Sequence, residues 1–409
     1  MSLNVKAIGA ALIVAGAMLG AGMLALPLVS AGMGFNMSLI TLGVTWVLMT
    51  YTGLMLLEVF LAFPEGSGFN VVSLNLLGKK GLFITNTTLM LLLHALTAAY
   101  IAGASTTYGS DIHQYFGANI PPALIAAGFT IIAGSIVFLS TRAVDNANRL
   151  LFTLKIIVFI LIAFSIHPYV KSYYLNTSHD SSRYLYAAFP VFITAFGFHG
   201  SIPSMVKYIG RENHKTLQAV FISGGLIPLG VYAIWEYCSL GVLPRVGPCS
   251  YVALSRHQGS VGMFLDYIHA STPGSLVPSL FSAFTSITLC TSFLCVSLGL
   301  FDAMASSLRH SDSQRGRLKT ALATYLPPFV FAWLFPQGFV IALGAAAIFL
   351  SILAILFPAA ALKKLRQRPN YHPAWKVPGG GPTIYVISLI GLFIIIFQIM
   401  KMQSLLPTF

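Results

Sequence analysis

The sequence predicts an all-α membrane protein with eleven transmembrane helices. Three observations support this fold class: the composition, the length of the apolar runs, and the placement of Lys and Arg. Hydrophobic residues make up 56% of the 409 residues and charged residues only 8%, with a mean hydropathy of +0.82. Soluble domains carry about 25% charged residues, so this chain cannot cover a surface that faces water. Lipid must be its outer solvent.

Apolar runs of the length that crosses a bilayer, about 20 residues, follow one another along the whole chain. Pro, Gly, Asn and charge clusters separate them, and Pro327-Pro328 interrupts the short ninth run. We expect a single transmembrane domain over residues 1–409. Its spans are expected at about 7–31, 37–63, 82–109, 122–141, 149–167, 185–207, 217–240, 277–305, 320–335, 339–361 and 383–405.

Lys and Arg are distributed unequally between the two sides of this arrangement. With eleven crossings, eighteen of the 23 basic residues fall on the side of the N-terminus. Because short cytoplasmic loops carry the excess of Lys and Arg, we predict a cytoplasmic N-terminus and an external C-terminus. One missed helix would invert every later loop, so the agreement also supports the span count. Basic residues in short loops of this kind do not indicate a nucleic-acid partner.

Two segments between the spans have their own pattern. Residues 65–81 place Phe69, Val72, Leu76 and Leu77 at helical spacing, which predicts an amphipathic helix along the inner surface. Residues 242–276 form the longest expected outer loop, long enough to cap an outer opening. The sequence leaves open whether the two cysteines that bracket the start of this loop, at positions 238 and 249, are bridged or free.

Helix-breaking residues lie at mid-depth in the first and sixth spans. The first span contains Gly16, Gly20, Gly22 and Pro27, and the sixth contains Phe196-Gly197-Phe198-His199-Gly200-Ser201-Ile202-Pro203. Glycine destabilises a helix and proline removes a backbone donor. Backbone groups freed in this way need other partners in lipid. An unwound stretch that faces a bound solute or ion would supply them.

The two breaks lie five spans apart. Because five is odd, a second copy of a five-span unit would sit upside down in the membrane. Interrupted helices at matching positions of two inverted halves indicate the central site of a transporter. Close helix packing through Gly16-x-x-x-Gly20 is the alternative for the first segment alone, and the matched pair favours the unwound interpretation.

The strings Gly20–Pro27 and Phe196–Ser204 resemble the signatures of the hydroxy and aromatic amino acid permease family, part of the amino acid–polyamine–organocation superfamily. The second string is most similar to the tyrosine-specific permeases, and the similarity covers nearly the whole chain. The resemblance implies a leucine-transporter-type fold, with inverted repeats over about 7–167 and 185–361 and an extra helix over 383–405. It also implies a symporter in the bacterial inner membrane that imports an aromatic amino acid together with protons, with tyrosine as the expected substrate.

The chemistry of the breaks suits a zwitterion. Free N–H groups near Gly20, Ala21 and Gly22 suit a carboxylate, and unpaired carbonyls suit an ammonium. Phe198 is a candidate for stacking on an aromatic side chain, with core packing as the alternative. For His199 the alternative is a hydrogen bond that holds the break. The expected substrate-binding residues are Ala17, Met18, Gly20, Ala21, Gly22, Tyr100, Phe196, Gly197, Phe198, His199 and Gly200.

Ion coupling has candidates in three places. Lys155 resembles in position a fifth-span lysine that stands in for sodium in some proton-coupled members of the superfamily; the alternative is a lysine that snorkels to the interface. Glu58 and Asp302 lie toward the inner ends of their spans and could pair with Lys155 or an Arg at an inner gate. Hydroxyls of Thr285 and Ser286 would suit a sodium site between the first and eighth spans, so sodium coupling stays open.

Other function classes have less support. The sequence contains no HExxH, GxSxG or Walker motif that would indicate an enzyme or a pump. A channel would need a selectivity motif and a symmetric pore. The same fold also carries other amino acids, and fold does not decide among them. We expect no enzymatic activity, no cofactor and no metal, with membrane lipid as the surrounding partner; the sequence leaves the oligomeric state open.

Overall fold

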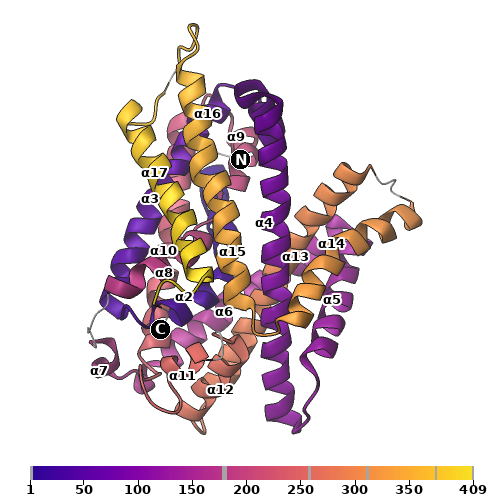
Figure 1. Cartoon of the computed structure of the whole chain (residues 1–409), viewed down its shortest axis with the longest axis vertical. Helices are drawn as coiled ribbons and strands as arrows, with labels where there is room; N and C mark the ends of the chain where they lie inside the picture. Colours follow the sequence, from indigo (N-terminus) through magenta and orange to yellow (C-terminus); the bar gives the residue numbers. More distant parts are fainter. Residues whose placement is uncertain (1–2, 177–181, 257–258, 310–312, 374, 408–409) are drawn as a thin grey trace.

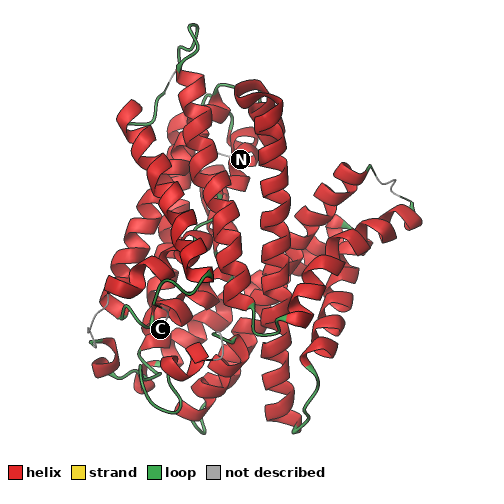
Figure 2. Ribbon diagram, in the orientation of Figure 1, coloured by secondary structure: helices red, strands yellow, loops and turns green. Residues whose placement is uncertain are grey.

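The computed structural model describes the whole chain except residues 1–2, 177–181, 257–258, 310–312, 374 and 408–409. Throughout this described part the regular secondary structure is helical (Figure 2). Eight predicted spans correspond to one helix each. These are α3 (Phe35–Leu61), α4 (Phe69–Phe116), α5 (Pro122–Leu139), α6 (Thr141–Ser165), α10 (His214–Leu240), α13 (Val277–Leu308), α14 (Gln314–Leu334) and α17 (Gly381–Met402).

The other three predicted spans are interrupted helices. The first is α1 (Leu3–Met18) followed by α2 (Gly22–Ser30), which meet at a bend of 54°. The sixth is α8 (Ser182–Ala195), a short 3₁₀ turn η2 (His199–Ser201) and α9 (Ile202–Ile209). The tenth is α15 (Phe339–Ser351), a π-helical segment η3 (Ile352–Leu356) and α16 (Phe357–Arg366). Both predicted breaks are therefore present.

Ten of the eleven predicted spans correspond to helices that could cross a membrane. In the described part of the chain, nine helices are long and apolar enough to cross a membrane, and the bent pair α1–α2 makes a tenth. The helix α14 occupies the place of the predicted ninth span, but it is not among these ten. It starts with Arg315, Arg317 and Lys319 and contains Pro327-Pro328, which lower its apolar character. Eleven spans thus remain a prediction.

The predicted amphipathic segment is the first part of α4. The helix bends at Gly78, whose φ of 71° lies in the left-handed region that glycine adopts without strain. Val72 and Leu76 are buried on one face of the short arm before the bend. The arm therefore leaves the direction of the long helix and packs its apolar face against the protein.

The segment 242–276, predicted as an outer loop, is partly helical. It contains α11 (Tyr251–Arg256) and α12 (Val261–Ser271), and α12 packs against α4 and α13. Two further short elements, η1 (His167–Tyr169) and α7 (Ser172–Leu175), follow α6. The question of a bridge between Cys238 and Cys249 is answered, because both thiols are free and Cys238 is buried.

The broken helices lie inside the bundle. In α2, Gly22 to Leu28 and Ser30 are all buried, and α2 packs against α8 while α1 packs along α10. Around them, α13 contacts α4 and α6, and α10 contacts α3 (Figure 1). The two breaks therefore meet near the middle of the molecule, surrounded by helices from both predicted halves.

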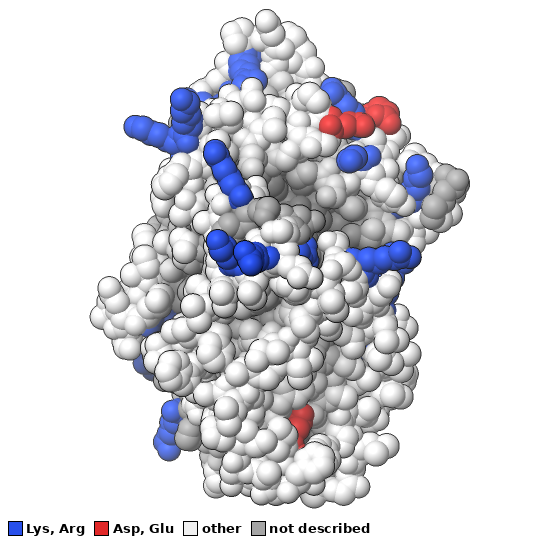
Figure 3. Space-filling view, turned by 90° about the vertical axis from the view of Figure 1, so that its right-hand side faces the viewer, with Lys and Arg blue, Asp and Glu red and all other residues white. Residues whose placement is uncertain are grey.

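The two ends of the molecule differ in charge. The start of α1 and the end of α17 lie in opposite halves (Figure 1). Most of the Lys and Arg side chains visible in Figure 3 lie in the upper half. That half contains the end of α16, with Lys363, Lys364 and Arg366 in its last turn, and the loop that follows, with Arg368.

Candidate substrate and ion site

The first break, between α1 and α2, is held by side chains from other helices. The Gly20 amide donates to the Met18 carbonyl at 2.6 Å, closing a tight turn. The Ala21 amide donates to the Ser292 hydroxyl of α13 at 2.8 Å. The Lys155 ammonium of α6 donates to the Leu19 carbonyl at 2.6 Å. The described residues offer no acceptor to the next amide, that of Gly22.

The second break, between α8 and η2, also exposes backbone groups that helices normally pair. The Ala195 carbonyl at the end of α8 accepts from the Tyr232 hydroxyl at 2.7 Å. Beyond it, the Phe198 carbonyl accepts from both the amide and the hydroxyl of Ser201, at 2.9 and 2.7 Å. The chain thus leaves helical geometry for three residues and re-enters it through the turn η2.

The two breaks touch one another. A Cβ atom at Gly22 would lie 3.3 Å from the Cα of Ala195, so only glycine permits this approach without a shift. The Tyr232 hydroxyl of α10 lies between the breaks, because it contacts the Met18 carbonyl at 2.6 Å as well as that of Ala195. The substrate-binding residues predicted from both spans therefore converge on one place.

Phe198 and His199 are enclosed in this conformation. The Phe198 ring stacks on Phe221 with centroids 5.7 Å apart, and a Cβ at Gly53 would collide with it at 2.4 Å. His199 Nε2 lies 2.9 Å from the Thr52 hydroxyl of α3. Its Nδ1 is buried and has no partner in the described part of the chain. Phe198 therefore takes part in core packing here, and His199 links the break to α3.

The remaining predicted substrate residues differ in their surroundings. Tyr100 of α4 is buried. Phe196 is buried edge-on to the Tyr232 ring, at 5.2 Å and 82°. Gly197 lies against Leu350 of α15. The side chain of Ala17 is exposed, and Gly200 has open space where a side chain would be.

Lys155 is 5% exposed and does not extend to the surface. Besides the Leu19 carbonyl, its ammonium lies 3.5 Å from the Thr291 hydroxyl and 4.9 Å from the centroid of the Phe152 ring. The snorkelling alternative is therefore wrong for this conformation. The amine occupies a position between the first break and the eighth predicted span, where carbonyl and hydroxyl oxygens converge.

The other ion-coupling candidates lie apart from this contact. Thr285 is fully buried, and its hydroxyl has no partner among the described residues, while Ser286 lies beside the Tyr108 hydroxyl. Asp302 is exposed in the field of Arg317. Glu58 forms an ion pair with Arg366 at 2.6 Å. An arginine was one of the two partners predicted for it, and Lys155 was the other.

Four contact residues were outside the predicted site. Tyr232, Thr291 and Thr52 gave no distinguishing signal in the sequence, because each is one of several hydroxyl-bearing residues in its helix. Ser292 was visible as a hydroxyl of the eighth span. It lies two helical turns beyond Thr285, so the hydroxyl that reaches the first break is further along α13 than expected.

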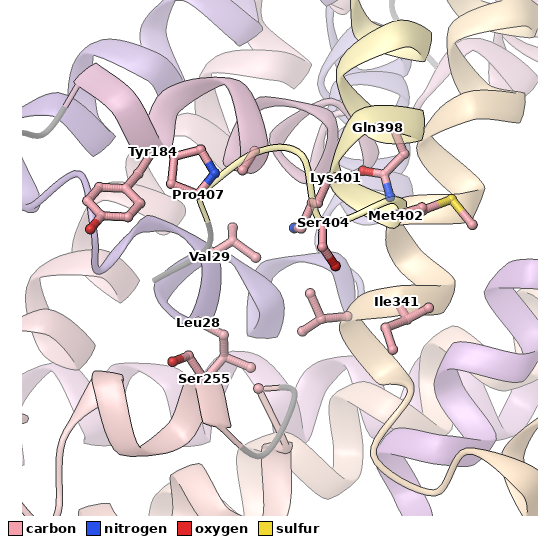
Figure 4. Close-up of a pocket in the computed structure, with 13 residues that line it drawn as sticks. Leu28, Val29, Tyr184, Ser255, Ile341, Gln398, Lys401, Met402, Ser404 and Pro407 are labelled. Carbon is pink, nitrogen blue, oxygen red and sulfur yellow. The ribbon is translucent and has the colours of Figure 1, made fainter.

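A cavity of about 380 Å³ opens beside α2 and α8 (Figure 4). Leu28 and Val29 of α2, Tyr184 of α8, and Lys401 and Gln398 of α17 contribute to its lining. None of the predicted substrate-binding residues lines it. This cavity is thus separate from the contact between the two breaks.

Comparisons with known proteins extend over nearly the whole chain. Residues 4–398 match the tryptophan/tyrosine permease family. The chain is 36% identical to a tryptophan-specific transport protein of Haemophilus influenzae, over 96% of this chain and 95% of the relative. It is 33% identical to tyrosine-specific transport system 1 of the same organism, over 95% of each chain. A tryptophan-specific transport protein of Pseudomonas aeruginosa is 32% identical, over 98% of this chain and 96% of the relative.

Proposed function

Because the chain belongs to the tryptophan/tyrosine permease family, we propose that it is a proton-coupled symporter that imports an aromatic amino acid, with tyrosine as the first candidate. The relatives are transport proteins rather than enzymes, and the many apolar helices make this a multi-pass membrane protein. The observation that supports proton coupling is the buried Lys155 ammonium on the carbonyl of Leu19. Tryptophan is the second candidate, because tryptophan-specific relatives are at least as similar as tyrosine-specific ones.

The substrate site is proposed at the contact between the two breaks. The α-carboxylate would accept from the Gly22 amide at the start of α2, where the helix dipole favours an anion. The ammonium would lie at the carbonyls that end α1 and α8, those of Met18 and Ala195, with Phe196 and Gly197 next to them. The aromatic side chain would extend toward Phe198 and Tyr100. Their rings would need to separate from their present packing to admit it.

The coupled cation is proposed to be the proton on Lys155. A carbonyl oxygen and a hydroxyl oxygen, from Leu19 and Thr291, contact this ammonium. Oxygen atoms of these kinds would also suit a bound sodium ion. A lysine that already occupies the place competes with sodium, and it can release its proton because a buried ammonium is costly. Sodium coupling through hydroxyls of α13, such as Thr285 and Ser286, is the alternative that the experiment must distinguish.

The membrane arrangement is proposed from chain direction and charge. With α14 counted as a span there would be eleven crossings, so the two termini would lie on opposite sides of the membrane. The start of α1 and the end of α17 lie in opposite halves of the molecule, which supports this arrangement (Figure 1). Repeats of five spans over about 7–167 and 185–361 would then be inverted, with α17 outside both. The basic loops would face the cytoplasm of a bacterial cell, across its inner membrane.

The experiment is uptake of radiolabelled tyrosine into proteoliposomes that contain the purified chain. We expect saturable uptake that rises with an inward proton gradient and is unchanged by replacing sodium with potassium. Unlabelled tryptophan and phenylalanine should compete, and alanine or lysine should not. Uptake that requires sodium would contradict proton coupling, and gradient-independent ion conductance would favour a channel. The absence of uptake for every aromatic amino acid would reject the proposal.

A further inference from the structure

The Tyr232 hydroxyl lies between the two breaks and contacts a backbone carbonyl at each of them. It contacts the Met18 carbonyl at 2.6 Å and the Ala195 carbonyl at 2.7 Å. Met18 is the last residue of α1, and Ala195 is the last residue of α8. The hydroxyl therefore joins the ends of the two half-helices that precede the breaks. Tyr232 is fully buried, so water does not share this contact from the surface.

The phenol has one proton for the two carbonyl oxygens that face it. The Met18 carbonyl also accepts from the Gly20 amide at 2.6 Å, whereas the Ala195 carbonyl has the phenol as its donor. Each carbonyl also ends a helix, where the backbone dipoles leave a partial negative charge. Two negative helix ends that face only neutral donors, the phenol and the Gly20 amide, form a site better suited to a cation with several N–H groups. An α-ammonium has three such donors and a positive charge.

We propose that the Tyr232 hydroxyl holds the place of the substrate's ammonium while the carrier is empty. The phenol satisfies the Met18 and Ala195 carbonyls so that the two breaks can stay in contact without substrate. When an amino acid binds, its ammonium takes over both carbonyls and the hydroxyl moves off them. Tyr232 is then a positioning residue for the empty carrier. This role rests on the proposed substrate site.

The role has a kinetic consequence. A symporter that performs net uptake must return empty, and that step needs the freed carbonyls paired, since an unpaired buried carbonyl is costly. Exchange of internal for external substrate never requires the empty form to reorient. Removal of the Tyr232 hydroxyl should therefore slow net uptake and spare exchange. It should also strengthen binding of ligands with an α-amino group, because the competing donor is gone.

The test is Tyr232→Phe in proteoliposomes. This change keeps the ring that packs edge-on against Phe196. We expect net tyrosine uptake to fall about tenfold, the range of one lost buried hydrogen bond. Tyrosine–tyrosine exchange should stay within about twofold of wild type, and the dissociation constant for tyrosine should fall several-fold. The analogue 3-(4-hydroxyphenyl)propionate, which lacks the amino group, should show no gain in affinity.

Tyr251→Phe is the matched control. Its phenol is also buried, and its hydroxyl has no partner in the described part of the chain. We expect this variant to resemble wild type in all three assays. Equal losses of exchange and net uptake in Tyr232→Phe, or an equal affinity gain for the analogue, would overturn the role of Tyr232. Failure of wild type itself to exchange any aromatic amino acid would instead contradict the proposed function.

Discussion

At the scale of single residues, Lys155 has a contact that a structural lysine would not need. Its ammonium donates to the Leu19 carbonyl, which the break in the first span has released from helix pairing. No acidic side chain in the described part of the chain forms an ion pair with it. A buried cation without a counter-ion is unfavourable unless polar atoms compensate for lost hydration. The break and the lysine therefore stabilise one another, and loss of the proton would weaken this contact, because a neutral amine is a weaker donor than an ammonium.

Replacing Lys155 by Met should uncouple transport. Met fills a similar length without charge, so the fold should be retained. A gradient of one pH unit supplies about 1.4 kcal/mol per proton and drives at most about tenfold accumulation. In proteoliposomes with that gradient, we expect accumulation to fall to the equilibrated level while exchange continues. The exposed Lys80→Met is the control. Proton-driven accumulation by the Lys155→Met variant would exclude the lysine as the coupling group.

Lys155 and the two glycine-rich breaks were predictable because charge and helix breakers are conspicuous in apolar runs. Tyr232 was not, because tyrosine is ordinary in a membrane helix and its importance lies in two carbonyls 214 and 37 residues away. Phe198 shows the opposite case. The sequence indicated its position in the break, but only tertiary packing shows that Phe221 and Gly53 enclose its ring here.

At the scale of elements, the C-terminal end of α3 binds the loop between α16 and α17. The Glu58 carboxylate is fully buried and bonds Arg366 through both oxygens, at 2.9 and 2.6 Å. It also accepts from the Tyr371 hydroxyl at 3.1 Å and from the Val377 amide at 2.6 Å. Burial and the nearby Glu58 carboxylate raise the pKa of Tyr371, so its phenol stays a donor at neutral pH.

Glu58→Ala should destabilise the folded protein. Removing one partner of a buried ion pair costs about 3–5 kcal/mol, because the other charge is left unpaired. We therefore expect a clearly lower melting temperature in detergent, followed by intrinsic fluorescence. Glu65→Ala is the control, since Glu65 is exposed and accepts one backbone hydrogen bond at 3.2 Å. It should change the stability by less than about 0.5 kcal/mol. Equal melting of the two variants would show that the Glu58 network contributes little.

The apolar runs predicted where most helices lie, but they did not predict every irregular segment within those helices. The bend of α4 at Gly78 was within reach of the sequence, since an amphipathic stretch there adjoins an apolar one. The π-helical segment at Ile352–Leu356 had no signal, because all five residues are apolar and suit an ordinary helix. The helix α14 shows a limit of another kind. Its position was predicted, yet its basic first turns and proline pair keep it below the apolar character of the other spans.

At the scale of the whole molecule, the distribution of Lys and Arg and the course of the chain must both fit one orientation of the protein in the membrane. Eighteen of 23 Lys and Arg residues fall on one predicted side, and those visible in Figure 3 gather mainly in the half that contains the loop after α16. The straight part of α4, from residue 79 to 116, connects the two halves. At about 1.5 Å per residue it is roughly 55 Å long, enough to cross a hydrocarbon core of about 30 Å.

Cysteines placed at the two ends of α4 should therefore be labelled from opposite sides. Lys79 and Ala118 are both exposed, so each can carry a reporter in a background whose four native cysteines are replaced by serine. In intact cells, a membrane-impermeant maleimide should label Ala118→Cys and leave Lys79→Cys unreacted until the membrane is disrupted. The reverse pattern would place the basic loops outside and contradict the charge argument. Labelling of both in intact cells would mean that α4 does not cross the membrane. Every later helix would then be inverted, and the matched, opposed half-helices on which the proposed transport site depends would be lost.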